Sequence, residues 1–234
     1  TDFIGPPYGV LAIVSALEYR HRTGKGQCLD LSQLEASVQP LGAVLLDYEV
    51  NGRVMERQGN RDKSYVPHGA YPCQGEDRWV AIAVTSDKEW KGLCQVMGNP
   101  DWTQESCFAT FLERKKNEDE LNVLMSGWTS GLKAEEAMEI LQKNGVPAGV
   151  VSNPRDLRED PQLNSRGHYW EFNHSVLGKH FCDAPASKFS KTSAQPQRPV
   201  PLLGEHNDLV YKDFLGLSDE EISELVVEGV IEVQ

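Results

Sequence analysis

The chain has 234 residues, of which 39% are hydrophobic and 25% charged, a composition typical of soluble globular proteins. Its formal net charge is −12 and no lysine- or arginine-rich block is present, so nucleic acid is not an expected partner. No apolar run is long enough to cross a bilayer, so we expect no membrane span.

The cysteines are scattered, odd in number and without a CxxC pair. This pattern favours reduced thiols in a cytoplasmic protein over a disulfide framework or a zinc site. The cysteines are Cys28, Cys73, Cys94, Cys107 and Cys182.

The first expected element is a helix that follows Pro6 and Pro7, where a first helical turn tolerates proline. Apolar residues at positions 8–19 cover nearly its whole circumference, which predicts a helix buried on most sides. Gly24 and Gly26 end it. Because this apolar pattern begins almost at once and no initiator Met precedes it, we interpret the chain as starting inside a larger protein.

A short strand is expected at residues 27–31. Ser32 and Glu35 then form a capping-box pattern that opens a helix to about residue 50, with a kink at Pro40. The polar, basic stretch 53–64 has no periodicity and is interpreted as a linker.

The middle of the chain has a strand-then-helix pattern of its own, which indicates a separate small domain. Its expected strands are residues 65–73, 78–84 and 146–151, and its expected helices are residues 86–97, 118–128 and 134–144. The remaining residues predict a short helix at 157–166, a hairpin at 168–182, an extended segment at 183–204 and a closing helix at 218–227.

Motifs for phosphate, dinucleotide, nucleophilic-serine or zinc chemistry are missing from the sequence. His174 and His180 face each other across the expected hairpin, but solvated loop histidines are the favoured interpretation. Composition and spacing alone therefore predict an acidic α/β protein with two lobes and indicate nothing more specific.

Ordered sequence blocks carry the interpretation further. Asp-Phe-Ile-Gly at residues 2–5 precedes Ala-Leu-Glu-Tyr-Arg at 16–20 and Thr-Gly-Lys-Gly-Gln at 23–27, with Asp30 in the strand that follows. Further blocks occur at residues 75–82, 144–149, 160–161, 166–167, 201–206 and 229–231. In this order they resemble class III CoA-transferases, the CaiB/BaiF family, and specifically the carboxyl-terminal part of such a chain.

The resemblance implies an α/β fold with a large Rossmann-like domain and a smaller α+β domain, assembled as an interlocked homodimer. Residues 1–57 would belong to the large domain and linker, 58–158 to the small domain, and 159–234 to the returning large domain. Without the other half of such a protein, the apolar helix at residues 8–19 would be exposed and the piece poorly stable.

The family's catalytic aspartate corresponds to Asp2, at the amino end of the buried helix, where the helix dipole favours a carboxylate. The implied reaction moves CoA from an acyl-CoA to a carboxylic acid through an aspartyl-CoA thioester, without a metal. Backbone amides of the same turn, or of a glycine loop opposite, would hold the oxyanion. The loop that covers the site in some members corresponds to residues 64–71, which lack a glycine run, and within it Tyr65, His68 and Gly69 are candidate substrate- or CoA-binding residues.

Two alternatives remain at this point. Related acyl-CoA racemases use the same aspartate with a histidine and a glutamate, but residues 83–86 here lack a glutamate at the expected position. A non-catalytic subunit of a two-subunit transferase is the second. The identity of the acceptor acid has no marker in the sequence.

Overall fold

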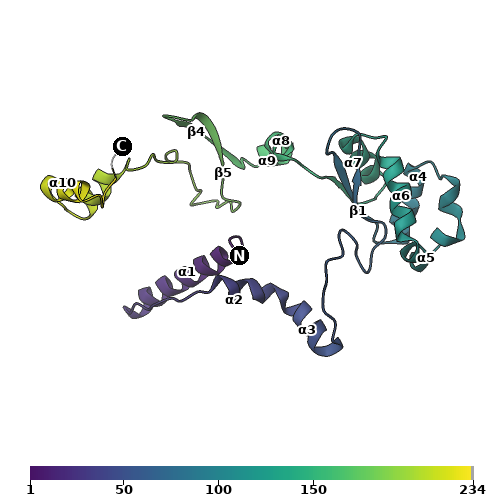
Figure 1. Ribbon diagram of the computed structural model, residues 1–234, viewed down its shortest axis with the longest axis horizontal. Coiled ribbons are helices and arrows are strands. Elements are labelled where there is room, and N and C mark those ends of the chain that lie inside the picture. The colour runs from purple at the N-terminus through teal and green to yellow at the C-terminus, as the bar shows by residue number, and fades with distance from the viewer. Residues whose placement is uncertain (233–234) are drawn as a thin grey trace. The chain divides into compact units, whose positions relative to one another are not determined.

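The computed structural model describes residues 1–232 and shows a chain of mixed helix and sheet, as expected (Figure 1). It divides into two compact units, residues 1–149 and 150–234. The expected small-domain limits, 58 and 158, stay predictions.

Unit 1 opens with helices alone. These are α1 (Gly5–Thr23), α2 (Gln33–Val38), the 3₁₀ turn η1 (Gln39–Leu41) and α3 (Gly42–Asn51). The expected kink at Pro40 is confirmed as η1. Gly24 ends α1 in the left-handed conformation, at φ +73°, a conformation that glycine adopts without steric cost.

Helix α1 is exposed over most of its surface in this chain. Of its residues Gly5 is the buried one, and apolar side chains such as Leu11 (66% exposed) and Val10 (61%) face solvent. The expectation of a helix buried on most sides is therefore wrong for the chain as described, because residues 1–232 include no sheet that covers α1. The expectation that the apolar helix at residues 8–19 is exposed without the other half of the protein is confirmed.

The strand expected at residues 27–31 is absent from the structure, where these residues have no regular conformation. A strand is stabilised by the ladder it shares with a neighbour, and no described segment pairs with this one. Its apolar residue Leu31 instead approaches Gly9 of α1.

The rest of unit 1 is a small sheet packed with helices (Figure 1). Strands β1 (His68–Pro72) and β2 (Trp79–Ala83) form an antiparallel hairpin in which His68 pairs with Ala83, and β3 (Ala148–Val150) extends the sheet beyond β2. The helices are α4 (Asp87–Val96), α5 (Phe111–Lys116), α6 (Glu118–Thr129) and α7 (Ala134–Lys143), with 3₁₀ turns η2 (Asp101–Gln104) and η3 (Ser106–Phe108) before α5.

A continuous apolar core holds this part together. Its fully buried members come from both sheet and helices, and within residues 1–232 Arg114 is the charged residue among them. The apolar members include Val80, Ile82, Leu93, Phe108, Leu121, Met125 and Leu141.

Helix α4 begins where the sequence placed it, with Oγ of the N-cap Ser86 accepting from the amide of Glu89, although the Glu89 carboxylate accepts from the amide of Thr85 and does not complete a capping box. Helix α6 begins at Glu118, as expected.

Unit 2 is built from short elements. They are α8 (Pro154–Glu159), α9 (Pro161–Ser165), the hairpin of β4 (Tyr169–His174) and β5 (Gly178–Asp183), a π-helical turn η4 (Leu209–Phe214) and α10 (Asp219–Val227). The Oη of Tyr169 donates to the carbonyl of Leu157, and Arg158 stacks on Phe181, which ties α8 to the hairpin. Residues 184–202 form no helix or strand, as expected for the segment 183–204, and a turn follows at residues 203–206.

Candidate active site

Asp2 lies in the turn that leads into α1 and is exposed to solvent. Its Oδ1 accepts a hydrogen bond from Oγ1 of Thr1 at 3.2 Å, and it joins no ion pair with any residue from 1 to 232. It does not cap α1, whose N-cap is Ile4 without a side-chain hydrogen bond. Within residues 1–232, the Asp2 carboxylate therefore has no capping or ion-pair role.

Two amides at this helix end are engaged with the backbone. The N–H groups of Ile4 and Gly5 both donate to the carbonyl of Thr1, at 3.1 and 2.8 Å, and Pro6 and Pro7 carry no N–H. Donors for an oxyanion at Asp2 would therefore come from the rest of the turn or from a loop opposite.

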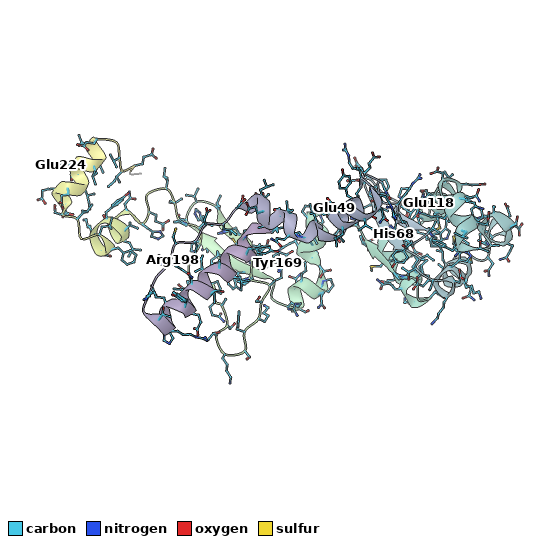
Figure 2. All side chains as sticks on the ribbon, turned by 90° about the horizontal axis from the view of Figure 1, so that it is seen from below. Glu49, His68, Glu118, Tyr169, Arg198 and Glu224 are labelled. Carbon is cyan, nitrogen blue, oxygen red and sulfur yellow. The ribbon has the colours of Figure 1, made fainter. Side chains whose placement is uncertain are left out.

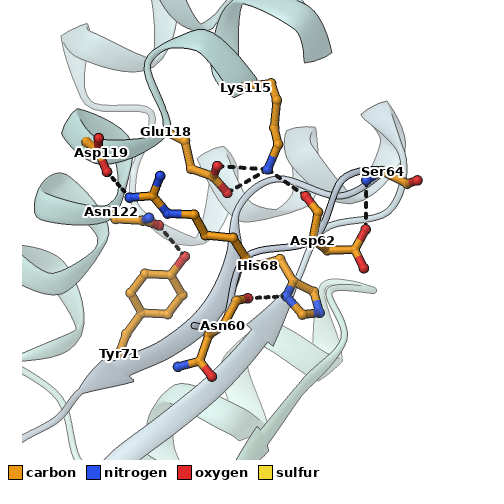
Figure 3. A network of polar contacts seen from close by, with 10 residues as sticks. Asn60, Asp62, Ser64, His68, Tyr71, Lys115, Glu118, Asp119 and Asn122 are labelled. Atoms are coloured by element: carbon orange, nitrogen blue, oxygen red, sulfur yellow. Dashed lines mark hydrogen bonds and ion pairs between the residues drawn. The ribbon is translucent and has the colours of Figure 1, made fainter. Parts of the chain in front are cut away.

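The stretch interpreted as a linker forms part of a structured polar network at its carboxyl end (Figure 3). Lys115 of α5 donates to the backbone carbonyl of Asp62 at 2.5 Å and to both carboxylate oxygens of Glu118 at 2.8 and 2.7 Å. Arg61 pairs with Asp119 of α6. The coil is thus fixed against the amino end of α6.

Of the three candidate binding residues, His68 and Gly69 lie together at the start of β1. Both line a pocket of about 220 Å³ with Tyr71, Asn122 and Ser126. Since the Asn60 carbonyl can only accept, His68 Nδ1, 2.6 Å away, carries the proton in this contact, and Nε2 is left for another partner. Tyr65 is 39% exposed, with its ring 6.3 Å from that of His68.

Tyr71 closes the inner side of this pocket. Its Oη donates to Oδ1 of Asn122 at 2.8 Å, and the residue is almost wholly buried. Burial, with a contribution from the charge of Glu118, raises the pKa of the Tyr71 phenol well above its usual range. Tyr71 therefore stays protonated and acts as a hydrogen-bond donor.

No hydrogen bond or ring contact within residues 1–232 joins Asp2 to Tyr65, His68 or Gly69. Asp2 belongs to the helical segment at the start of unit 1, whereas His68 and Gly69 belong to strand β1 and Tyr65 to the coil just before it. His68 of β1 and Glu118 of α6 both lie in the sheet-and-helix part (Figure 2).

The histidine pair of the hairpin differs from the expectation of two solvated residues. His174 is buried, and its ring meets that of His180 edge to face at a centroid distance of 5.8 Å. Nδ1 of His174 accepts from the amides of Val176 and Leu177, which fixes the turn. The two rings meet as diagonal neighbours of the hairpin, because the register pairs His174 with Gly178 and Phe172 with His180.

Among the described residues, no group of three or more His, Cys, Asp or Glu side chains is arranged to hold a metal ion. All five cysteines are free thiols, as expected. Within residues 1–232, no helix has the length and apolar character needed to span a membrane.

The described elements make this a chain of mixed helix and sheet. Asp2 precedes its first helix, and a compact sheet-and-helix part follows later in the chain. Residues 1–207 match the profile described as CoA-transferase family III, and the chain belongs to this family.

Individual relatives agree. A probable CoA-transferase, Rv1866 of Mycobacterium tuberculosis, is 32% identical over 231 residues, which are 98% of this chain and 29% of that protein. A succinyl-CoA–D-citramalate CoA-transferase of Chloroflexus aurantiacus is 27% identical, over 98% of this chain and 57% of that protein. A crystal structure of a CaiB/BaiF family protein from Brucella suis superimposes with a TM-score of 0.80 at 26% identity, over 90% of this chain and 54% of that one. The chain thus spans between 29% and 57% of the length of these relatives.

The sequence did not indicate the charged pocket beside the candidate residues. Arg57, Arg61 and Lys63 lie in a stretch without periodicity, and their neighbours Lys115 and Glu118 are more than 50 residues away along the chain. The one available signal was the local excess of basic residues in an otherwise acidic protein.

Proposed function

We propose that this chain carries the nucleophile of a CoA-transferase that moves CoA from an acyl-CoA to a carboxylic acid. The observation that carries the proposal is the exposed carboxylate of Asp2, within a chain whose residues 1–207 match the family. Its support is that Asp2 has no capping or ion-pair role among residues 1–232 that would explain it otherwise.

Each step forms and breaks one bond at a carbonyl carbon. The Asp2 carboxylate attacks the thioester, and loss of the CoA thiolate leaves a mixed anhydride. The thiolate then attacks the aspartyl carbonyl and expels the donor acid, which leaves an aspartyl-CoA thioester. The acceptor carboxylate attacks this thioester, and the released thiolate attacks the acceptor's acyl carbon and frees Asp2. No electron is gained or lost overall.

The proposal extends to the assembly. The chain spans about half of its relatives, and the apolar side chains of α1 and α3 are exposed within it. Because exposed apolar surface of this extent is unfavourable in water, a larger assembly, either a homodimer or a pair of different subunits, would cover it. The substrates would be an acyl-CoA and a carboxylic acid, as the name of the Chloroflexus relative states for that protein.

The test is the intact mass of the complete protein before and after incubation with acyl-CoA donors such as succinyl-CoA. We expect an increment of one CoA, mapped to the peptide that contains Asp2. The Asp2→Asn variant should lose both the increment and turnover while keeping its circular dichroism spectrum. A matched control is Glu76→Gln, which removes an exposed carboxylate in the β1–β2 turn and should leave both unchanged.

Two outcomes would redirect the assignment. Exchange of the α-proton of an acyl-CoA in deuterated water, without an acceptor acid and without a CoA adduct, would indicate the racemase reaction. Full activity of the Asp2→Asn variant would instead indicate that this chain is the non-catalytic subunit of a two-subunit transferase.

A further inference from the structure

The coil that precedes the candidate binding residues is held by side-chain contacts with α5, α6 and β1 (Figure 3). Residues 58–64 form no helix or strand, so their position depends on such contacts. The contacts are Lys115 with the carbonyl of Asp62, Arg61 with Asp119, and His68 with the carbonyl of Asn60.

Lys115 makes the contact that lies deepest in the protein. Its ammonium group has three N–H donors, and three oxygens lie within hydrogen-bond distance. These are the carbonyl oxygen of Asp62 at 2.5 Å and both carboxylate oxygens of Glu118, at 2.8 and 2.7 Å. The side chain of Glu118 is 7% exposed and that of Lys115 is 25% exposed. Without the ammonium group, a buried carboxylate would be unpaired and the Asp62 carbonyl would lose this donor, and both changes are unfavourable.

The pair of Arg61 and Asp119 holds the coil more weakly. Their side chains are 50% and 82% exposed. Ion pairs that are this exposed contribute little to stability, because water and salt screen them. The position of the coil therefore depends mainly on Lys115.

The coil in turn positions His68. The Asn60 carbonyl, 2.6 Å from Nδ1, fixes the orientation of the ring and leaves Nε2 for another partner. Residues 58–61 also line the pocket of about 220 Å³ that contains His68 and Gly69. Asn60 is two residues from Asp62, so a shift of the carbonyl that Lys115 holds would move both the partner of the His68 ring and one wall of this pocket.

We infer that Lys115 is a positioning residue of the transferase site. It holds the coil 58–64 through the carbonyl of Asp62, and the coil orients His68 and completes its pocket. No hydrogen bond joins Lys115 to Asp2 within residues 1–232, so its effect is on binding rather than on the attack at the thioester. The inference rests on the proposed function, with His68 as a residue that contacts the substrate or CoA.

The first experiment tests the hold on the coil without any substrate. Limited digestion of the complete protein with trypsin measures cleavage after Arg61 and Lys63, which both lie in the coil. We expect Lys115→Met to raise this cleavage rate about tenfold, because proteolysis follows the population of the open form. The matched control is Lys116→Met, which removes a cation from the same helix whose ion pair with Glu113 is exposed, and it should leave the rate unchanged.

A second variant keeps the test decisive if Lys115→Met fails to fold. Lys115→Met combined with Glu118→Met replaces the buried pair with apolar side chains, a change that proteins often tolerate. It still leaves the Asp62 carbonyl without its donor, so cleavage after Arg61 should rise as in the single variant. Folded variants that resist trypsin as well as the wild-type protein does would overturn the inference.

The second experiment follows the exchange of labelled succinate into succinyl-CoA, a transfer in which donor and acceptor acid are the same. We expect Lys115→Met to raise the KM for succinyl-CoA about tenfold and to change kcat less than about twofold, because binding is weakened while Asp2 is untouched. The Lys116→Met control should change neither. A fall in kcat at unchanged KM would contradict a positioning role.

A double-mutant cycle with His68→Ala separates positioning from general stability. Alone, His68→Ala should raise the KM about tenfold. In the Lys115→Met background it should raise the KM less than about twofold further, since the ring is no longer held there. Independent effects that multiply to about a hundredfold would show that Lys115 does not act through His68, and would overturn the inference.

The two experiments also distinguish failure of the inference from failure of the proposed function. If the wild-type protein shows no exchange but Lys115→Met is cleaved faster, the proposed function fails and the hold on the coil stands. If exchange occurs with the same KM in the wild-type protein and in Lys115→Met, the inference alone fails.

Discussion

Gly92 is the residue at which helix α4 comes closest to the loop that leads into β3. A Cβ atom added there would lie 2.6 Å from the backbone carbonyl oxygen of Asn144 and 3.3 Å from Cγ2 of Val146. The first contact is with backbone, which cannot rotate away as a side-chain end does. The glycine therefore permits α4 and the end of α7 to pack in direct contact.

We expect Gly92→Ala to lower the free energy of unfolding of this part by about 1–3 kcal/mol, because α4 must shift away from the loop. The measurement is the urea midpoint followed by tryptophan fluorescence, since Trp90 lies on the same helix. Gly127→Ala on α6 is the matched control. No atom lies within 4 Å of an added Cβ there, so alanine should be neutral or stabilise by up to about 1 kcal/mol. Equal destabilisation by both variants would contradict the role given to Gly92.

At the scale of elements, Arg114 joins α5 to the start of α4. The side chain is 2% exposed, stacks on Trp90 with its guanidinium carbon 4.6 Å from the ring centroid, and donates to the carbonyl of Phe108 and to Asp87. Its Nε has no hydrogen-bond partner among residues 1–232. The planar guanidinium thus combines stacking and a forked donor in one buried position.

We expect Arg114→Lys to cost about 2 kcal/mol, because an ammonium group cannot stack on Trp90 and reach both acceptors while it stays desolvated. Arg114→Met should cost less, since it removes the buried charge and leaves Asp87, which is 77% exposed, to be hydrated. Thermal unfolding of the two variants beside Lys116→Gln, an exposed cation on the same helix, checks this order. A smaller loss for lysine than for methionine would contradict it.

Elements whose signals are local could be predicted from the sequence. Ser86 and Glu89 give the start of α4, and Gly145 follows the end of α7, because capping depends on residues within one turn. Residues 101–116 were missed, since the 3₁₀ turns η2 and η3 and the short helix α5 have no sustained apolar period.

The parts of the candidate site that depend on residues nearby in the sequence could be predicted. Asp2 and the segment around His68 were predicted from the sequence blocks that surround them. The polar network was not, because Lys115 reaches the carbonyl of Asp62 across 53 positions, and periodicity carries no information on such a contact. Residues 53–64 form no helix or strand, as the linker interpretation expects, but the contacts of residues 61 and 62 with α5 and α6 could not be predicted from the sequence.

At the scale of the whole molecule, the two parts of unit 1 differ in how they are stabilised. Helices α4, α6 and α7 bury Leu93, Leu121 and Leu141 completely. Helix α1 has 19 residues, and most of its apolar side chains are exposed within this chain. Because helices in proteins gain most of their stability from packing rather than from intrinsic propensity, α1 depends on a surface that residues 1–232 do not provide.

We therefore expect residues 1–234 on their own to show two levels of hydrogen-exchange protection. Amides of α1 and α3 should exchange close to the rate of an unprotected peptide, while those of α6 and α7 should be protected, because local opening follows the burial of each region. In the complete assembly α1 should become protected and α6 should change little, which makes α6 the internal control. A chain that melts as one cooperative monomer, with α1 as protected as α6, would show that α1 needs no further surface and that the assembly proposed for it is wrong.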